Sequence, residues 1–430
     1  MTQSPSYRLK AAVLVTTVGL VGTVVLGSTV LDPSPTQVSA PHSLTEIPDY
    51  AGTAQINTPF YDAVKPPAGV APGTLLKSEP ILGGPPGITA KRFSYVSQTA
   101  AGKPLVVTAL YAVRDAPSPG PNGRPLVAFA HGTTGMAPGC GISQAPFTPN
   151  STGIGTWDQV LSALVGAGFA VVATDYANMG VPGTPNYLVM KGEAHDVLNS
   201  ARAAFALDPT SIDRSEVAIM GHSQGGHSAL SAAYEAPTYA PDVAIKGTIA
   251  IAPAIFPPAP LLIKFIQASP DKPADYFLSF IADAVNSWSA NYPGRIKSSD
   301  VFTPAGVKAA NVALTKCLRA TAAAFSGPKG DYVQKTIPTS LLSVAQENFP
   351  VYRKYAQPML IQQGLEDTTV VPGVNLAAAR TFCLQGSQVN LQTFPDDVHS
   401  SVLYTGQPDA ITWLNDRFEG KPFKSDCGGL

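Results

Sequence analysis

The sequence has little charge and no concentration of either sign. Only 13% of its 430 residues are Asp, Glu, Lys or Arg, and the formal net charge is -1. This balance gives no electrostatic reason to expect nucleic acid as a partner. The chain also has no internal repeat and no block of like charges. Because 45% of the residues are hydrophobic, the composition predicts a large core and a rather apolar surface.

Cysteine is scarce and widely spaced, at Cys140, Cys317, Cys383 and Cys427. No C-x-x-C pair occurs, so the pattern indicates neither a redox motif nor a metal site, and no metal is predicted. An even number of distant cysteines favours two structural disulfides in an oxidising compartment, and three pairings fit. Four buried free thiols are the alternative.

The chain has a single long hydrophobic run, and it lies near the N-terminus. Arg8 and Lys10 precede residues 11–31, which are uncharged and largely apolar, and Val38-Ser39-Ala40 has the small residues of a cleavage site. We therefore expect residues 1–40 to be a signal peptide or an uncleaved N-terminal anchor. The protein is expected to be secreted or to reside in the cell envelope.

One short stretch has the features of a nucleophile. Four apolar residues from Val217 to Met220 lead into Gly221-His222-Ser223-Gln224-Gly225, and a helix-like run follows from His227 to Glu235. Strand, sharp turn and helix form the context of a G-x-S-x-G nucleophile elbow, in which glycine is needed on both sides of the serine. The bare motif is weak, and an ordinary Gly-Ser turn is the alternative. In this context the motif predicts Ser223 as a nucleophile.

A second loop has the features of an oxyanion hole. The apolar run Leu126 to Ala130 is typical of a buried parallel strand, and it ends in His131-Gly132-Thr133-Thr134-Gly135. In α/β-hydrolases the loop at this place supplies one backbone N–H to the oxyanion, and the residue after the nucleophile supplies the other. We expect Gln224 to be one donor and either Gly132 or Thr133 to be the second. An ordinary Gly/Thr turn is the alternative.

The alternating strands and helices predict a mostly parallel sheet flanked by helices, with a large helical cap insertion. The position of the elbow after the third of these strands suits an α/β-hydrolase fold. We expect an extended N-terminal arm over residues 41–90 and the two parts of the hydrolase core over 91–254 and 351–430. A helix is expected over 187–207. Strands over 246–252 and 358–364 would belong to the core.

About a hundred residues separate those two strands, far more than a normal connection. Helical apolar spacing recurs in this insertion at 261–266, 276–281 and 307–325. We interpret residues 255–350 as a helical cap or lid over the active site. A helical subdomain without a gating role is the alternative.

A serine nucleophile needs a base, and the base needs a carboxylate. Of the six histidines, only His399 lies C-terminal to the elbow and its helix, in the loop after the expected last strand, 389–394. In the α/β-hydrolase order the acid lies between serine and histidine along the chain. His399 is therefore the predicted base, against the alternative of a surface-loop histidine.

The predicted acid is Asp367, which lies in the loop after the strand that ends at Gly364. A carboxylate there can reach a histidine in the loop after the neighbouring strand. Glu366 is its rival. Asp396 and Asp397 are too close in sequence to the histidine to be favoured, and we interpret them as loop-capping residues.

These motifs together resemble the secretory lipase family of the α/β-hydrolase superfamily, which includes the fungal lipase A type. The resemblance spans roughly residues 80–427. It rests on the elbow, the His131-Gly132-Thr133 loop, the Asp175-Tyr176 segment, the large insertion, and Asp367 and His399 near the C-terminus. It implies hydrolysis of carboxylic esters, often acylglycerols. It also implies disulfides pairing Cys140 with Cys317 and Cys383 with Cys427. The aspartate that some fungal members carry in the oxyanion loop is absent from His131-Gly132-Thr133.

The expected function is that of an exported serine carboxylic ester hydrolase, a lipase or esterase that forms an acyl-enzyme and needs no cofactor. Its partner would be an ester or lipid substrate, with peripheral contact between the cap and a lipid interface. An acyltransferase that uses the same triad is the main alternative. A peptidase and an inactive binding protein are further ones.

Overall fold

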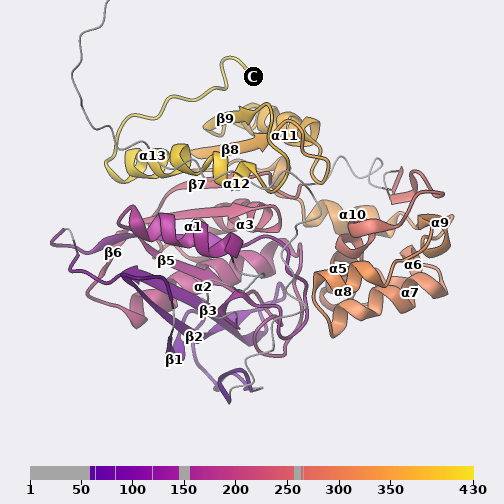
Figure 1. Ribbon diagram of the computed structural model, residues 1–430, viewed down its shortest axis with the longest axis horizontal. Coiled ribbons are helices and arrows are strands. Elements are labelled where there is room, and N and C mark those ends of the chain that lie inside the picture. The colour runs from indigo at the N-terminus through magenta and orange to yellow at the C-terminus, as the bar shows by residue number, and fades with distance from the viewer. Residues whose placement is uncertain are drawn as a thin grey trace, which may run out of the picture. The chain divides into compact units, whose positions relative to one another are not determined.

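The computed structural model of the chain has one mixed β-sheet with helices on both of its faces (Figure 1). It describes residues 59–430, apart from 63, 83, 119, 145–154, 256–262 and 265. The segment expected to direct export therefore lies outside the described residues. Among the described helices, none is long and apolar enough to cross a membrane.

The sheet has nine strands within the described residues, in the order β1-β2-β3-β5-β4-β6-β7-β8-β9. The first three strands form an antiparallel meander that joins β5, and all pairs from β5 through β4 to β9 are parallel. The prediction of a mostly parallel sheet is thus confirmed. The strands are β1 (Leu75–Ile81), β2 (Ile88–Gln98), β3 (Pro104–Arg114), β4 (Arg124–Ala130), β5 (Ala170–Thr174), β6 (Ile212–His222), β7 (Ile245–Ile251), β8 (Met359–Gly364) and β9 (Val389–Phe394).

Central strands are buried on both faces, which explains their continuous apolar sequences. In β4, Leu126 and Ala128 pack in one hydrophobic cluster, whereas Val127 and Phe129 pack in another on the opposite face. One face is covered by α2 (Met190–Leu207), α3 (Gln224–Tyr239) and α11 (Pro372–Leu384), and the other by α1 (Gly155–Gly166), α12 (Val402–Thr405) and α13 (Gln407–Phe418).

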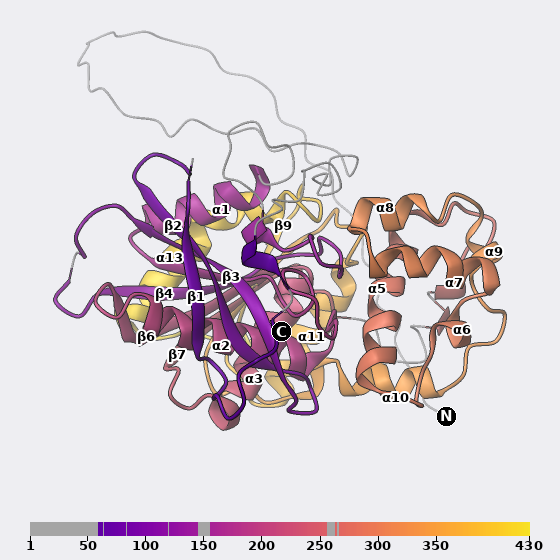
Figure 2. The ribbon, with the colours of Figure 1, turned by 90° about the horizontal axis from the view of Figure 1, so that it is seen from below.

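The insertion between β7 and β8 is helical. Its hydrophobic cluster, centred on α5, also includes Met136 and residues 187–189 from outside the insertion. Its helices appear in orange as a separate group beside the strands in both views (Figures 1 and 2). They are α5 (Asp275–Asn291), α6 (Ser298–Val301), α7 (Pro304–Ala310), α8 (Leu318–Ala323), α9 (Lys329–Tyr332) and α10 (Ser340–Glu347). Short 3-10 turns are η2 (Pro59–Tyr61), η3 (Ile142–Gln144), η4 (Asn311–Leu314) and η5 (Pro350–Tyr352).

Three local expectations differ from the structure. Strand β1 occupies residues that we assigned to the extended arm 41–90, because pairing with β2 decides its conformation. The helical pattern over 307–325 is broken into α7, η4 and α8, since Cys317 is bonded to another loop between them. The helix expected over 187–207 begins only at Met190, because Leu188 has a φ of 50°.

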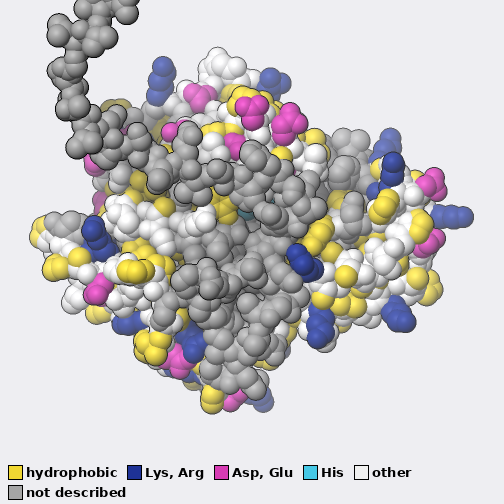
Figure 3. Space-filling model, in the orientation of Figure 1, with side chains coloured by type: hydrophobic (Ala, Val, Ile, Leu, Met, Phe, Trp, Pro, Cys, Tyr) yellow, Lys and Arg dark blue, Asp and Glu magenta, His cyan; other side chains and the backbone are white. Residues whose placement is uncertain are grey.

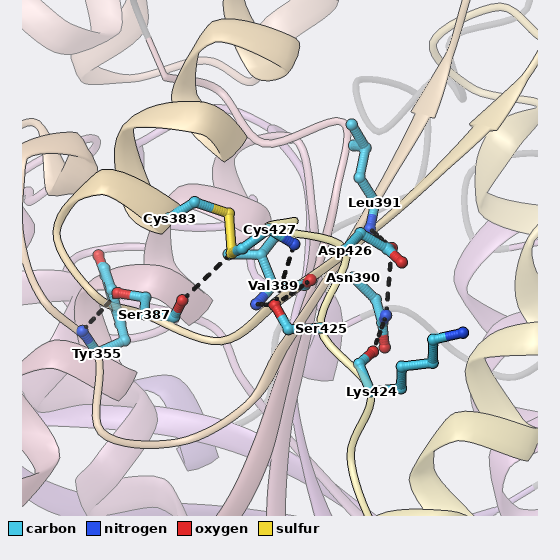
Figure 4. The surroundings of a disulfide bond; sticks show 10 residues. All are labelled: Tyr355, Cys383, Ser387, Val389, Asn390, Leu391, Lys424, Ser425, Asp426 and Cys427. Carbon is cyan, nitrogen blue, oxygen red and sulfur yellow. Dashed lines mark hydrogen bonds between the residues drawn. A yellow bond between two sulfur atoms is a disulfide. The ribbon is translucent and has the colours of Figure 1, made fainter. Parts of the chain in front are cut away.

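The chain ends along the outer edge of β9, where one disulfide holds it (Figure 4). Cys383 of α11 is bonded to Cys427, as the resemblance implied. The Asp426 N–H donates to the Val389 carbonyl (2.8 Å), and the Leu391 N–H donates to Asp426 Oδ2 (2.9 Å). The C-terminal segment thereby covers backbone groups of an edge strand that would otherwise be open to pairing.

Replacing both Cys383 and Cys427 by serine is expected to lower the free energy of unfolding by about 2–4 kcal/mol, because the bond closes a long loop of the unfolded chain. Urea denaturation measures this loss, and ester hydrolysis should remain, since the bond lies away from Ser223. The wild-type protein under the same non-reducing conditions, with both disulfides intact, is the comparison. An unchanged urea midpoint would show that the disulfide contributes nothing.

Candidate active site

Ser223 lies in a sharp turn between β6 and α3, with φ 57° and ψ -118°. This backbone conformation is rare for a residue with a side chain. A Cβ at Gly221 would approach the Gly225 carbonyl oxygen to 2.1 Å, and a Cβ at Gly225 would approach the Ala130 carbonyl oxygen to 1.8 Å. Glycine is therefore required on both sides, as the elbow motif predicts.

The structure brings two further predicted residues together. His399, in the loop after β9, lies with its Nδ1 2.7 Å from Oδ2 of Asp367, in the loop after β8. Since a carboxylate only accepts hydrogen bonds, Nδ1 carries the proton and Nε2 is left as an acceptor. This is the tautomer that a base for a serine hydroxyl requires.

Asp367 is buried and its carboxylate is well supplied with donors. Its Oδ1 accepts the backbone N–H groups of Thr369 and Val370, each at 2.8 Å. Burial raises the pKa of the Asp367 carboxyl, but the hydrogen bond and charge of His399, with these two N–H groups, outweigh burial and lower it below its usual value. The neighbouring Glu366 is exposed.

The other acidic rivals have different roles or positions. Asp397 accepts hydrogen bonds from the hydroxyls of Ser401 (2.6 Å) and Thr405 (3.1 Å), which fits the interpretation of a loop-capping residue. Asp396 is exposed in the same loop. Both follow β9 in the loop of His399 itself, whereas Asp367 follows the neighbouring strand β8.

His222 supports the loop of His399 through a side-chain hydrogen bond, a role that no motif in the sequence indicated. Its Nε2 donates to the backbone carbonyl of His399 at 2.8 Å, and the two rings lie 4.7 Å apart. Burial, followed by the charge of His399, lowers the pKa of His222 to about 3, so this ring stays neutral. Its position inside the elbow motif is variable, so no sequence signal marked it.

The predicted oxyanion loop lies against the first turn of α3, as the contact between Gly225 and Ala130 requires. Thr133 Oγ1 and the Tyr187 hydroxyl lie 2.9 Å apart, and the Tyr176 hydroxyl donates to the His131 carbonyl at 3.0 Å. Burial lowers the pKa of His131 to about 4. Tyr176, which belongs to the Asp175-Tyr176 segment of the resemblance, and Tyr187, which no motif indicated, therefore support the loop that contains Gly132.

A disulfide fastens this loop to the helical insertion. Cys140 is bonded to Cys317, at the start of α8, as the resemblance implied. Beside it, the Leu318 N–H donates to the Thr134 carbonyl at 3.0 Å. The insertion is thus joined covalently to the segment that follows β4.

An apolar pocket of about 440 Å³ opens at Ser223, which keeps 9% of its surface exposed. Its walls come from the predicted oxyanion loop, the insertion and the loop of Asp367. The volume suits a small organic ligand or an acyl chain. The lining residues are Thr133, Tyr187, Ser223, Ala254, Ile255, Lys264, Ala268, Phe277, Phe280, Thr369, Val370, Val371 and Val374.

The described pocket lining contains one charged side chain, that of Lys264. On the side that Figure 3 draws, basic and acidic side chains both occur over the described surface, and neither sign covers a large area. Within the residues that the structure describes, no group of three or more His, Cys, Asp or Glu side chains could hold a metal ion.

Comparison with known proteins shows the family of the chain. A sequence model described as secretory lipase matches residues 144–426, which is more than half of the chain. The chain belongs to the secretory lipase family. A secreted triacylglycerol lipase of Malassezia globosa is 26% identical over 251 residues, which are 55% of this chain and 53% of that protein. The chain thus spans about half the length of that curated relative.

Solved structures show that the chain has the α/β-hydrolase fold. Candida antarctica lipase A in its closed state aligns with a TM-score of 0.69 at 17% identity, covering 86% of this chain and 88% of that one. The rice cell wall degrading esterase LipA of Xanthomonas oryzae aligns with a TM-score of 0.67 at 18% identity, covering 82% and 100%.

Proposed function

We propose that the protein is an exported carboxylic ester hydrolase, a lipase or esterase, which works through Ser223, His399 and Asp367 and forms an acyl-enzyme. Three observations together carry this proposal: a strained serine elbow, an apolar pocket that opens at this serine, and a histidine whose Nδ1 is bonded to a buried carboxylate. The loop of this histidine is bonded to His222, the residue before the serine. Membership of the secretory lipase family supports the same reaction class.

In the proposed mechanism His399 Nε2 takes the proton of the Ser223 hydroxyl while its oxygen attacks the ester carbonyl. The proton then passes to the alcohol as it leaves. Water next attacks the acyl-enzyme while His399 takes its proton, and the acid is released as the proton returns to Ser223. Asp367 keeps His399 in the required tautomer and stabilises its charged form.

The developing oxyanion would be stabilised by backbone N–H groups of Gln224 and of Gly132 or Thr133. Gln224 is the first residue of α3, so no preceding helical turn accepts its N–H. The positive end of the helix dipole adds to this stabilisation. The acyl chain would lie in the apolar pocket against the side chains from the insertion.

The test is hydrolysis of p-nitrophenyl esters from acetyl to palmitoyl, with product analysis in the presence of glycerol. Free acid as the main product would support hydrolysis. Glycerol esters as the main product would instead indicate acyl transfer. No release of p-nitrophenol from any ester would overturn the proposal.

Replacing Phe280 by alanine is expected to shift the preferred acyl chain towards longer esters, because Phe280 of α5 lines the pocket that opens at Ser223. One methylene in an apolar pocket changes kcat/KM by roughly tenfold or more, so the ratio of rates for palmitoyl and butyryl esters should rise at least tenfold. Phe302, buried in the insertion away from the pocket lining, provides the control Phe302→Leu. Equal profiles for wild type and Phe280→Ala would mean that the acyl chain binds elsewhere.

A further inference from the structure

A buried carboxylate lies directly behind the proposed oxyanion site. Glu193, in the first turn of α2, is completely buried. Its Oε1 accepts the Leu188 N–H and the Gln224 side-chain amide, each at 2.9 Å. Its Oε2 pairs with His227 Nδ1 at 2.7 Å and accepts the Ser228 hydroxyl at 2.8 Å. A buried carboxylate so fully bonded has a fixed position.

Three of these four partners are in the first turn and a half of α3, which begins directly after Ser223. Helices are usually held at this end by the side chain of the N-cap residue. Here the N-cap is Ser223, which makes no capping hydrogen bond, and a nucleophile needs its hydroxyl for the reaction. Glu193, which belongs to α2, therefore holds this end of α3 in place through hydrogen bonds, as the N-cap side chain does not.

Glu193 also connects this helix end to the insertion. The Nε2 of its partner His227 lies 2.7 Å from the Asn348 carbonyl oxygen. Because a carbonyl oxygen only accepts hydrogen bonds, Nε2 carries a proton. A second proton lies in the hydrogen bond between His227 Nδ1 and Glu193. Leu188, whose N–H Glu193 binds, accepts a hydrogen bond at its carbonyl from the indole of Trp288 in α5 (2.9 Å). Helix α3 therefore contacts the Glu193 carboxylate directly. The insertion is connected to it by two chains of hydrogen bonds, one through His227 and one through Leu188.

We propose that Glu193 is a positioning residue for the oxyanion site. By binding the side-chain amide of Gln224, it fixes the position of the backbone N–H of Gln224. The inference rests on the proposed function, because only a reaction that develops an oxyanion uses that N–H. Complete loss of an oxyanion donor lowers kcat about 10²–10³-fold. A displaced donor retains part of its effect, so a loss of about tenfold follows.

The decisive variant is Gln224→Met, which keeps the backbone N–H and the side-chain length but removes the bond to Glu193. We expect kcat to fall about tenfold while KM changes less than twofold. Affinity for an alkyl trifluoromethyl ketone, whose serine adduct carries an oxyanion, should fall by the same factor as kcat. Affinity for the matching alkyl amide, which develops no oxyanion when it binds, should stay unchanged.

Glu193→Gln is the second variant, because its amide keeps one oxygen for Gln224 and Leu188 but cannot accept the Ser228 hydroxyl. Its kcat should fall by at least as much as that of Gln224→Met. Ser231→Ala is the matched control, since Ser231 is buried in the same helix and bonds only to the His227 carbonyl. If Glu193→Gln fails to fold, Gln224→Met decides alone.

Two results separate failure of this inference from failure of the proposed function. If wild type hydrolyses esters and Gln224→Met has wild-type kcat and ketone affinity, the positioning role is wrong while the hydrolase proposal stands. The same holds if Ser231→Ala loses as much kcat as Gln224→Met. If wild type hydrolyses no ester, the proposed function fails and this inference fails with it.

Discussion

Replacement of Ser223 by alanine is expected to lower kcat/KM for p-nitrophenyl ester hydrolysis by about 10⁴–10⁶-fold, the range found when a nucleophilic serine is removed. The serine is the proposed site of the acyl-enzyme, and no ester can form at position 223 without the serine hydroxyl. Alanine is compatible with the pocket and removes only the hydroxyl oxygen. The remaining rate would come from the oxyanion donors and from binding.

The control for this experiment is again Ser231→Ala, a buried serine two turns further along α3 that should hydrolyse esters at the wild-type rate. Labelling with an alkyl fluorophosphonate, followed by peptide mass spectrometry, should modify the peptide that contains Ser223 in wild type and leave the alanine variant unlabelled. Activity within tenfold of wild type in Ser223→Ala would exclude this serine as the nucleophile.

Replacement of Asp367 by asparagine is expected to lower kcat by about 10⁴-fold, as it does when a triad carboxylate becomes an amide. The N–H groups of Thr369 and Val370 bind one carboxylate oxygen, so the amide oxygen of asparagine would take that place. Its NH₂ group would then face His399 Nδ1 and donate to it. The histidine proton would move to Nε2, where it blocks acceptance of the Ser223 proton.

The same variant tests the pKa of this carboxyl. Because the folded protein lowers the pKa of Asp367, ionisation stabilises the fold above the unfolded pKa of about 3.9, and this stability is lost as the pH falls through the folded value. Urea denaturation of wild type and Asp367→Asn should therefore differ at pH 7 and converge towards pH 3.

Glu366→Gln provides the matched control, since this neighbour is exposed and should keep its kcat within about twofold of wild type. The assignment of the acid would be reversed if Glu366→Gln lost several orders of magnitude while Asp367→Asn remained active.

The sequence alone determined the features that depend on local chemistry or on chain order. The elbow could be predicted because glycine at 221 and 225 and a strand before a helix are constraints between neighbours in sequence. The apolar strands could be predicted because both faces of a parallel sheet are buried. His399 and Asp367 could be paired because loops after adjacent parallel strands lie at the same edge of the sheet.

Only the tertiary structure decided the contacts between distant residues. The bonds from His222 to the carbonyl of His399, from Tyr187 to Thr133 and from Glu193 to Gln224 join residues 177, 54 and 31 positions apart, and no local pattern encodes them. The break between η4 and α8 likewise follows from a disulfide to Cys140, although the apolar spacing there favours one helix. Helical periodicity reports which side of a segment is buried, but the partner that buries it is set by packing of the whole chain.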